Sequence, residues 1–248
     1  MSTPQAKAED AKPLGFKAKL AELTCTISHV TVVTFTMAYM VLRFLVFDGP
    51  LPGFLYRGVF VAASAALGLV VYQKYTTGQF PHEIRPRDES VQYLYLAGVW
   101  LFTKERYFAS LPFAILSFFH ALTCDRSYLL PAMYATSPRG LAQRINYVVE
   151  KYKEPFTKFA AQVEFGQLIV LILTVLGAPK KVWRQFVLYA LFLRCRYEVS
   201  RYIQDITMSV EVRIDNWVPS GTDNALWLAI KAAVAAIPHP EPLPEPTN

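Results

Sequence analysis

The sequence predicts an all-α integral membrane protein with about six membrane segments, of which four form two short helical hairpins, plus amphipathic interfacial helices. Hydrophobic residues make up 53% of the 248 residues and charged residues only 18%, whereas a soluble domain is about 45–50% apolar and ~25% charged. Uncharged runs of near-membrane length alternate with short charged segments along the chain. This composition excludes a wholly disordered chain, because disorder needs low hydrophobicity and high charge.

The first two membrane segments are long apolar runs. A polar cytosolic tail of residues 1–20 precedes Leu23–Leu42, which carries no formal charge and ends before Arg43. At 1.5 Å per residue this run matches a hydrocarbon core of ~30 Å. The second run, Gly58–Gln73, contains small residues four positions apart, which let two helix backbones approach closely, unless they are merely tolerated in lipid. The predicted helix-packing residues are Ala62, Ser64, Ala66 and Gly68.

Two predicted hairpins with charged tips follow. In the first, Ser90–Thr103 and Tyr107–Cys124 flank Lys104–Arg106, and in the second, Phe165–Pro179 and Val182–Leu193 flank a pair of lysines. The first arm of each hairpin holds fourteen or fifteen uncharged residues, a length of about 21–23 Å. The hydrocarbon core of the ER membrane measures ~27 Å. We therefore expect arms that thin the bilayer, recruit flanking residues or lie shallowly.

Amphipathic patterns occupy the segments outside the hairpins. Over about residues 138–163, apolar residues recur every three or four positions and basic residues take the opposite side. This pattern predicts a cytosolic amphipathic helix that lies in the interface or covers the bundle. Apolar residues from Val199 to Trp217 predict a further helix, although Val210–Ile214 also alternates like a strand.

The C-terminal part of the chain falls outside the membrane helical domain, which we assign to residues 21–218. Residues 219–238 predict an interfacial amphipathic helix, because their apolar run is too short to span a bilayer. Residues 239–248 predict a disordered, Pro-rich tail. Aromatic and basic side chains suit the boundary between hydrocarbon and headgroups. The predicted membrane-interface residues are Trp100, Trp183, Trp227 and Lys231.

The charge distribution predicts the orientation of the chain. With six segments and both termini cytosolic, 18 of the 25 Lys and Arg residues are cytosolic and seven are lumenal. This split follows the positive-inside rule. A basic cluster after the last segment could hold anionic phospholipid headgroups or a partner, or could be ordinary topology-fixing charge. The candidates are Arg194, Arg196, Arg201 and Arg213.

The sequence contains no convincing catalytic or metal-binding constellation, so we expect neither enzymatic activity nor a cofactor. His120 and Cys124 stand four apart and could place two ligands on one helix face, but no third and fourth ligand accompany them. A histidine hydrogen-bonded inside the bundle explains this pair as well. Glu164 begins the fifth segment, where a carboxylate gains from the helix dipole and can stay interfacial. The alternative is a transport role, since a carboxylate in lipid is a site hypothesis by default.

Several short stretches, taken in order, resemble the transmembrane protein 33 family, also called the Krüppel homologue 2 family. The stretches are Glu89-Ser90-x-x-Tyr93-Leu94, Phe119-His120-Ala121, Arg196-Tyr197 with Arg201, and Glu211-x-Arg213. The resemblance covers roughly residues 20–218 and implies an integral protein of the ER and nuclear envelope. It implies membrane shaping, reticulon interaction and nuclear pore distribution without enzymatic activity. The family-matching residues are then structural or partner-facing: Glu89, Tyr93, His120, Tyr197 and Glu211.

We therefore expect a non-enzymatic ER and nuclear-envelope protein that shapes or stabilises curved membrane. Its expected partners are the lipid bilayer with its anionic phospholipids and either reticulon-type proteins or nuclear pore components, but not nucleic acid. One alternative is an accessory subunit of a larger ER membrane complex, such as a translocon, ligase or channel, docked through the small-residue helix face. A lipid-modifying enzyme or transporter is a further alternative, and it would need a polar cavity inside the membrane.

Overall fold

A computed structural model describes residues 16–45, 49–78, 88–124 and 139–217. Within these ranges the chain forms only helices and contains no strand, which confirms the predicted fold class. The helices are α1 (Phe16–Phe44), α2 (Pro50–Thr76), α3 (Glu89–Phe102), α4 (Leu111–Cys124), α6 (Arg139–Gly177), α7 (Pro179–Val199) and α8 (Arg201–Trp217).

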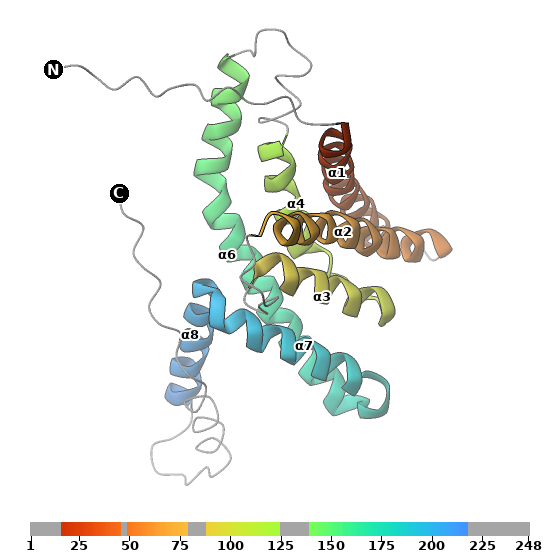
Figure 1. The fold of residues 1–248 in the computed structure, drawn as a ribbon. Coiled ribbons are helices and arrows are strands. Elements are labelled where there is room, and N and C mark those ends of the chain that lie inside the picture. Colours follow the sequence, from red (N-terminus) through yellow and green to blue (C-terminus); the bar gives the residue numbers. More distant parts are fainter. Residues whose placement is uncertain (1–15, 46–48, 79–87, 125–138, 218–248) are drawn as a thin grey trace, which may run out of the picture.

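Six of these helices close into a ring, and the seventh packs outside it. In order around the ring, α1 packs on α2, α2 on α3, α3 on α7, α7 on α6, α6 on α4, and α4 on α1. Figure 1 shows α2, α3 and α7 stacked in succession, while the first half of α6 runs beside α4 and its second half beside α7. The ring places α3 and α4 opposite each other, so the first predicted hairpin is splayed rather than closely paired.

A chain of aromatic rings crosses the interior and joins the opposite sides of the ring of helices. Phe113 of α4 stands at its centre, with its ring 5.3 Å from Phe60 of α2 and 5.4 Å from Tyr93 of α3. The path continues to α1 in one direction and to α7 in the other. Its successive rings are Tyr39, Tyr56, Phe60, Phe113, Tyr93, Phe192, Tyr189 and Trp100. All eight are nearly inaccessible, so this path is the packed core.

The α3–α4 connection ties together one end of the bundle, which we call the tip end. Glu105 pairs with Arg43 at the end of α1, with 2.9 Å between the carboxylate Oε2 and Nη2. Thr103 accepts hydrogen bonds from Arg57 of α2, through its carbonyl, and from Gln185 of α7, through its hydroxyl. Arg106 reaches α6 in the same way, through the hydroxyl of Thr174. The charged tip is thus packed against four other helices instead of protruding.

The opposite end of the bundle, which we call the pocket end, begins where α2 meets α3. The Asp88 carboxylate caps α3 by accepting from the backbone N–H groups of Ser90 and Val91, and it pairs with Lys74 of α2 at 2.7 Å. Partial burial acts to raise the pKa of Asp88, but the Lys74 ammonium and the two N–H groups outweigh it and hold the pKa below its usual value. Cap and ion pair together set the register of α3 against α2.

Close backbone approach between α1 and α2 occurs at a glycine outside the predicted small-residue face. A Cβ atom on Gly58 would lie 2.7 Å from the ring of Phe35, so any other residue there would force that ring to move. A Cβ on Gly68 would meet nothing within 4 Å. Ala66 is buried, whereas Ala62 and Ser64 are half-buried.

The number of spans differs from the predicted six. Within the described ranges, three helices are long and apolar enough to cross a membrane: Leu23–Phe44, Pro50–Thr76 and Gln143–Gly177. The two helices α3 and α4 have only 14 residues each, and α7 carries several charges. The count of six is therefore not confirmed. The predicted amphipathic helix and the fifth segment are fused, since α6 runs unbroken through Pro155.

Truncating the central ring should loosen the whole bundle. We predict that Phe113→Ala lowers the free energy of unfolding by about 3–5 kcal/mol, because it opens a cavity where α4 meets α2 and α3. Thermal unfolding of the purified chain in detergent measures the loss. Phe118→Ala on the same helix is the matched control, since this ring is 42% exposed, and its loss should stay below about 1 kcal/mol. Equal losses in both variants would contradict the conclusion that the aromatic path stabilises the bundle.

Candidate functional site

A charged cluster lies buried at the pocket end, where α3, α6 and α7 meet. Glu164 of α6 is 1% exposed and Arg196 of α7 is 5% exposed. The Glu164 carboxylate accepts a short hydrogen bond from the Tyr93 hydroxyl and lies 3.5 Å from Nε of Arg196. The guanidinium in turn donates to the Tyr93 hydroxyl at 3.2 Å and stacks 4.8 Å from the centre of that ring. Each of the three side chains therefore contacts the other two.

Further contacts fix the position of this cluster. Arg196 pairs with the half-exposed Glu89 at 2.9 Å, so the guanidinium faces two carboxylates. The Tyr189 hydroxyl donates to the backbone carbonyl of Glu164 at 2.7 Å, and the Gln92 side chain donates to the backbone carbonyl of Cys195 at 3.0 Å. A buried charge is tolerated only when it is paired and hydrogen-bonded. These contacts therefore constrain how α3, α6 and α7 slide against one another.

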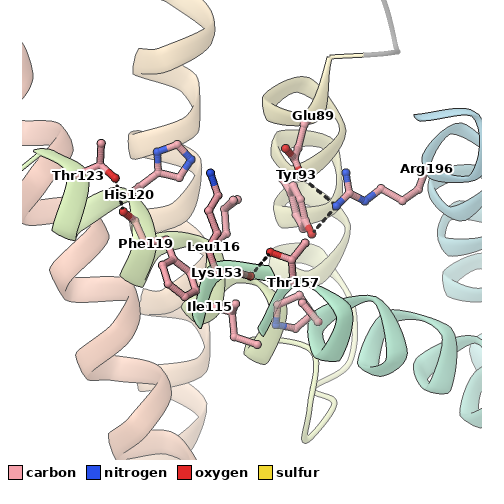
Figure 2. Close-up of a pocket in the computed structure, with 12 residues that line it drawn as sticks. Glu89, Tyr93, Ile115, Leu116, Phe119, His120, Thr123, Lys153, Thr157 and Arg196 are labelled. Atoms are coloured by element: carbon pink, nitrogen blue, oxygen red, sulfur yellow. Dashed lines mark hydrogen bonds and ion pairs between the residues drawn. The ribbon is translucent and has the colours of Figure 1, made fainter. Parts of the chain in front are cut away.

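A cavity of about 330 Å³ opens beside the cluster, in the interior of the ring. Figure 2 shows Glu89, Arg196, His120 and Lys153 around the same space, contributed by α3, α7, α4 and α6. Tyr93, Thr123 and Thr157 also line it, and apolar side chains complete the wall: Pro112, Ile115, Leu116, Phe119 and Ala160. The interior therefore contains a pocket with a charged mouth and an apolar wall.

A histidine pair continues the polar layer from the pocket to α1. The rings of His29 and His120 stack with centroids 5.2 Å apart, and Nδ1 of His29 lies 3.0 Å from the Ser117 hydroxyl. His29 is buried, and His120 borders the pocket. The structure thus places His120 against a second histidine. Within the described residues, no group of three or more His, Cys, Asp or Glu side chains could hold a metal ion.

The two polar ends of the bundle lie unusually close together. Ten residues separate Tyr93 from Thr103 on α3 and Glu164 from Thr174 on α6, and eleven separate Gln185 from Arg196 on α7. Each interval corresponds to about 15–17 Å along a helix. Three helices therefore give the same distance between the buried cluster and the tip end, measured inside the bundle.

The predicted headgroup and partner arginines fall into different environments. Arg196 is buried in the cluster, whereas Arg194 is half-exposed and pairs with Glu198 at 2.7 Å. Arg201 is exposed, and Arg213 lines a groove between α6 and α8. Only one of the four therefore belongs to the pocket.

The predicted interface and family-matching residues also separate. Trp100 lies in the core against Tyr189, which corrects its assignment to the interface, whereas Trp183 is 58% exposed. Trp227 and Lys231 fall outside the described residues. Glu164, predicted to stay interfacial, has its carboxylate buried between helices at the pocket end. Of the family-matching residues, Glu89, Tyr93 and His120 line the pocket, Tyr197 packs against the core, and Glu211 is half-buried on α8.

The functional residues missed from sequence include Lys153 and Thr157, which line the pocket, and Tyr189, which donates to the backbone of Glu164. Lys153 was assigned to the basic side of an amphipathic helix, and nothing in that pattern indicates a facing carboxylate on another helix. The available signal was the single acid Glu164 in an apolar run, because such a charge needs a cation in the fold. Beyond the basic residues at the start of α7, the next cations after Glu164 are Arg194 and Arg196. Hydrophobic periodicity does not tell which of the two pairs with Glu164.

Breaking the buried pair should be far more damaging than replacing it. We predict that Arg196→Met lowers the free energy of unfolding by about 3–5 kcal/mol, because the Glu164 carboxylate loses its buried cation. The double variant Glu164→Leu/Arg196→Met should recover most of this loss. Arg194→Met, which breaks a more exposed pair on the same helix, should cost at most about 1 kcal/mol. Thermal unfolding in detergent compares the variants, and a double variant no better than Arg196→Met would contradict the pairing.

Comparisons with known proteins agree with the resemblance drawn from the sequence. Nucleoporin POM33 of Chaetomium thermophilum is 33% identical, with 74% of this chain and 72% of that protein covered. The pore membrane protein of 33 kDa of Saccharomyces cerevisiae is 25% identical over 65% of each chain. Tetra-spanning protein 1 of Schizosaccharomyces pombe is 28% identical, with 74% and 73% covered. No solved structure matches. The family model described as transmembrane protein 33/nucleoporin POM33 matches residues 5–232, and the chain therefore belongs to this family.

Proposed function

We propose that the chain is a non-enzymatic membrane protein of the ER and nuclear envelope that stabilises curved membrane at the nuclear pore. Two relatives carry the words nucleoporin and pore membrane protein in their names, which supports association with the pore and its membrane. Nuclear pore components or reticulon-type proteins would be its protein partners. The function resides in the way the bundle deforms lipid, and needs no reaction at a catalytic group.

The short helices α3 and α4 are the observation that carries this proposal. Each has 14 residues and is therefore about 21 Å long, some 6 Å less than an ER hydrocarbon core. Helices this short thin the bilayer beside them or draw flanking residues to the interface, and each ångström of mismatch costs a fraction of a kcal/mol. A bilayer that is already strained reduces this penalty. The protein would therefore concentrate where the membrane is bent.

An asymmetry between the two ends supports a preference for one sign of curvature. The first half of α6 exposes Tyr152, Phe156 and Phe159, and α8 exposes Met208 and Val212. Both segments lie at the pocket end, where α8 follows α7 and contacts α6. Apolar side chains inserted between headgroups of one leaflet expand that leaflet alone. With the pocket end cytosolic, as the positive-inside rule indicates, this expansion favours positive curvature on the cytosolic side.

Lengthening α3 tests the mismatch mechanism. Four leucines inserted within α3 add about 6 Å, which brings its length close to that of an ER hydrocarbon core. We predict that enrichment on membrane tubes pulled from giant vesicles, relative to the flat membrane, falls at least about threefold. A Gly-Ser-Gly-Ser insertion after Gly78 adds the same number of residues outside a helix and should leave enrichment unchanged. If the lengthened protein unfolds at the parent temperature yet still partitions like the parent, the mismatch mechanism is wrong.

Cysteine accessibility tests the proposed orientation. In a cysteine-free background, Lys104→Cys and Lys180→Cys should be labelled by a membrane-impermeant maleimide only after the lumenal face of microsomes is opened. Tyr75→Cys at the pocket end should be labelled in sealed microsomes, because that end would face the cytosol. These three side chains are exposed, so a lack of labelling reflects the membrane and not burial. Labelling of position 104 in sealed microsomes would contradict the orientation.

A further inference from the structure

We propose that the interior pocket binds one phospholipid whose zwitterionic headgroup carries a primary amine, of the phosphatidylethanolamine class. The headgroup would occupy the charged mouth between Glu89 and Lys153, and an acyl chain would follow the apolar wall of α4. This site does not depend on the curvature mechanism, because it concerns binding inside the ring and not deformation of the surrounding bilayer.

The polarity of the pocket changes along its depth in the way a lipid requires. On α4, Thr123 and His120 lie at the pocket end, while Pro112 lies about three turns deeper, toward the tip end. The charged groups Glu89, Lys153 and Arg196 accompany the first two, and Ile115 and Leu116 accompany the third. A headgroup at the mouth therefore directs its chain into the apolar part. The volume of about 330 Å³ falls within the usual range of small-molecule sites.

The charges at the mouth match one phosphate and one amine. Arg196 is already compensated, since it contacts both Glu164 and Glu89. Lys153 is exposed and lines the pocket, so its ammonium is available to a phosphate, and charge-assisted hydrogen bonds of this kind are among the stronger ones. The Glu89 side chain is 49% exposed, so its carboxylate can accept hydrogen bonds from an amine. Lysine and glutamate thus complement the two charges of a zwitterion.

The same residues disfavour the other common headgroups. A quaternary ammonium has no N–H to donate and is bound best over open aromatic faces, but the guanidinium of Arg196 already covers the Tyr93 ring. Phe119 is the other aromatic residue that lines the pocket, and its ring meets Phe156. An anionic headgroup without an amine would offer no cationic donor to the exposed side of the Glu89 carboxylate, whose cation partner is Arg196. The pocket therefore selects a primary amine over choline and over phosphatidylglycerol.

Binding is tested on the purified full chain in detergent, by the rise in unfolding temperature with added dioctanoyl phospholipids. We expect dioctanoyl phosphatidylethanolamine to raise the unfolding temperature until the effect saturates. Its half-maximal effect should occur at a concentration at least tenfold lower than that of the phosphatidylcholine or phosphatidylglycerol analogue. Lys153→Gln and Glu89→Gln should each weaken this response about tenfold or more. Lys151→Gln is the matched control, because Lys151 is exposed on the same helix and bonds Tyr147 instead.

Further measurements distinguish a phospholipid from soluble molecules that carry the same phosphate and amine. Soluble phosphoethanolamine and inorganic phosphate should produce no shift at the concentrations used, and an equal shift by either would overturn a lipid as the ligand. Equal responses to all three phospholipids, or a stronger response to phosphatidylglycerol, would overturn the amine selectivity. An unchanged response in Lys153→Gln would overturn the location. Enrichment of Lys153→Gln on membrane tubes should match the parent, so failure here is separable from failure of the curvature mechanism.

Discussion

The burial of Glu164 and Arg196 is the constraint on which the rest of this bundle depends. Inside an apolar ring neither group tolerates isolation, so α6 and α7 must keep the one register in which the two side chains meet. Tyr93 brings α3 into the same register, because its hydroxyl contacts both charges. The pocket lies beside this cluster, between α3, α4, α6 and α7.

Packing at the other end reinforces the same arrangement by different means. The tip between α3 and α4 combines hydrogen bonds from Gln185, Arg57 and Arg106 with one partly exposed ion pair, so it holds the helix ends together without a fully buried charge. Between the tip and the charged cluster, the aromatic path supplies contact area that does not depend on register. Rings of this size bury well in edge-to-face geometry and accept small rotations. The bundle therefore combines a polar layer that fixes helix register at each end with a packed aromatic layer between them.

The helices and the family were predictable from sequence, whereas the site was not. Apolar runs, proline starts and the acidic cap at Asp88 depend on local chemistry, so they are visible in a single sequence. Glu164 and Arg196 are 32 positions apart and Tyr93 is 71 positions before Glu164, and no local rule places them together. Trp100 illustrates a different limit, since an indole suits an interfacial belt and a packed core equally. Pro155 is a helix-breaking residue, yet α6 continues through it although residues 151–156 are all exposed.

That proline also limits how deeply α6 can sink. Pro155 lacks an N–H, so the carbonyl of Lys151 loses its helical donor. In hydrocarbon an unsatisfied carbonyl costs several kcal/mol, whereas water or a headgroup satisfies it readily. With the pocket end at the membrane surface, as proposed, the turn from Lys151 to Pro155 would limit how deeply α6 can enter the bilayer. In a thickening bilayer, α6 could not adapt by sliding inward and would have to change its tilt, which would turn its attached neighbours with it. The tilt angle of α6 would thus depend on the thickness of the bilayer.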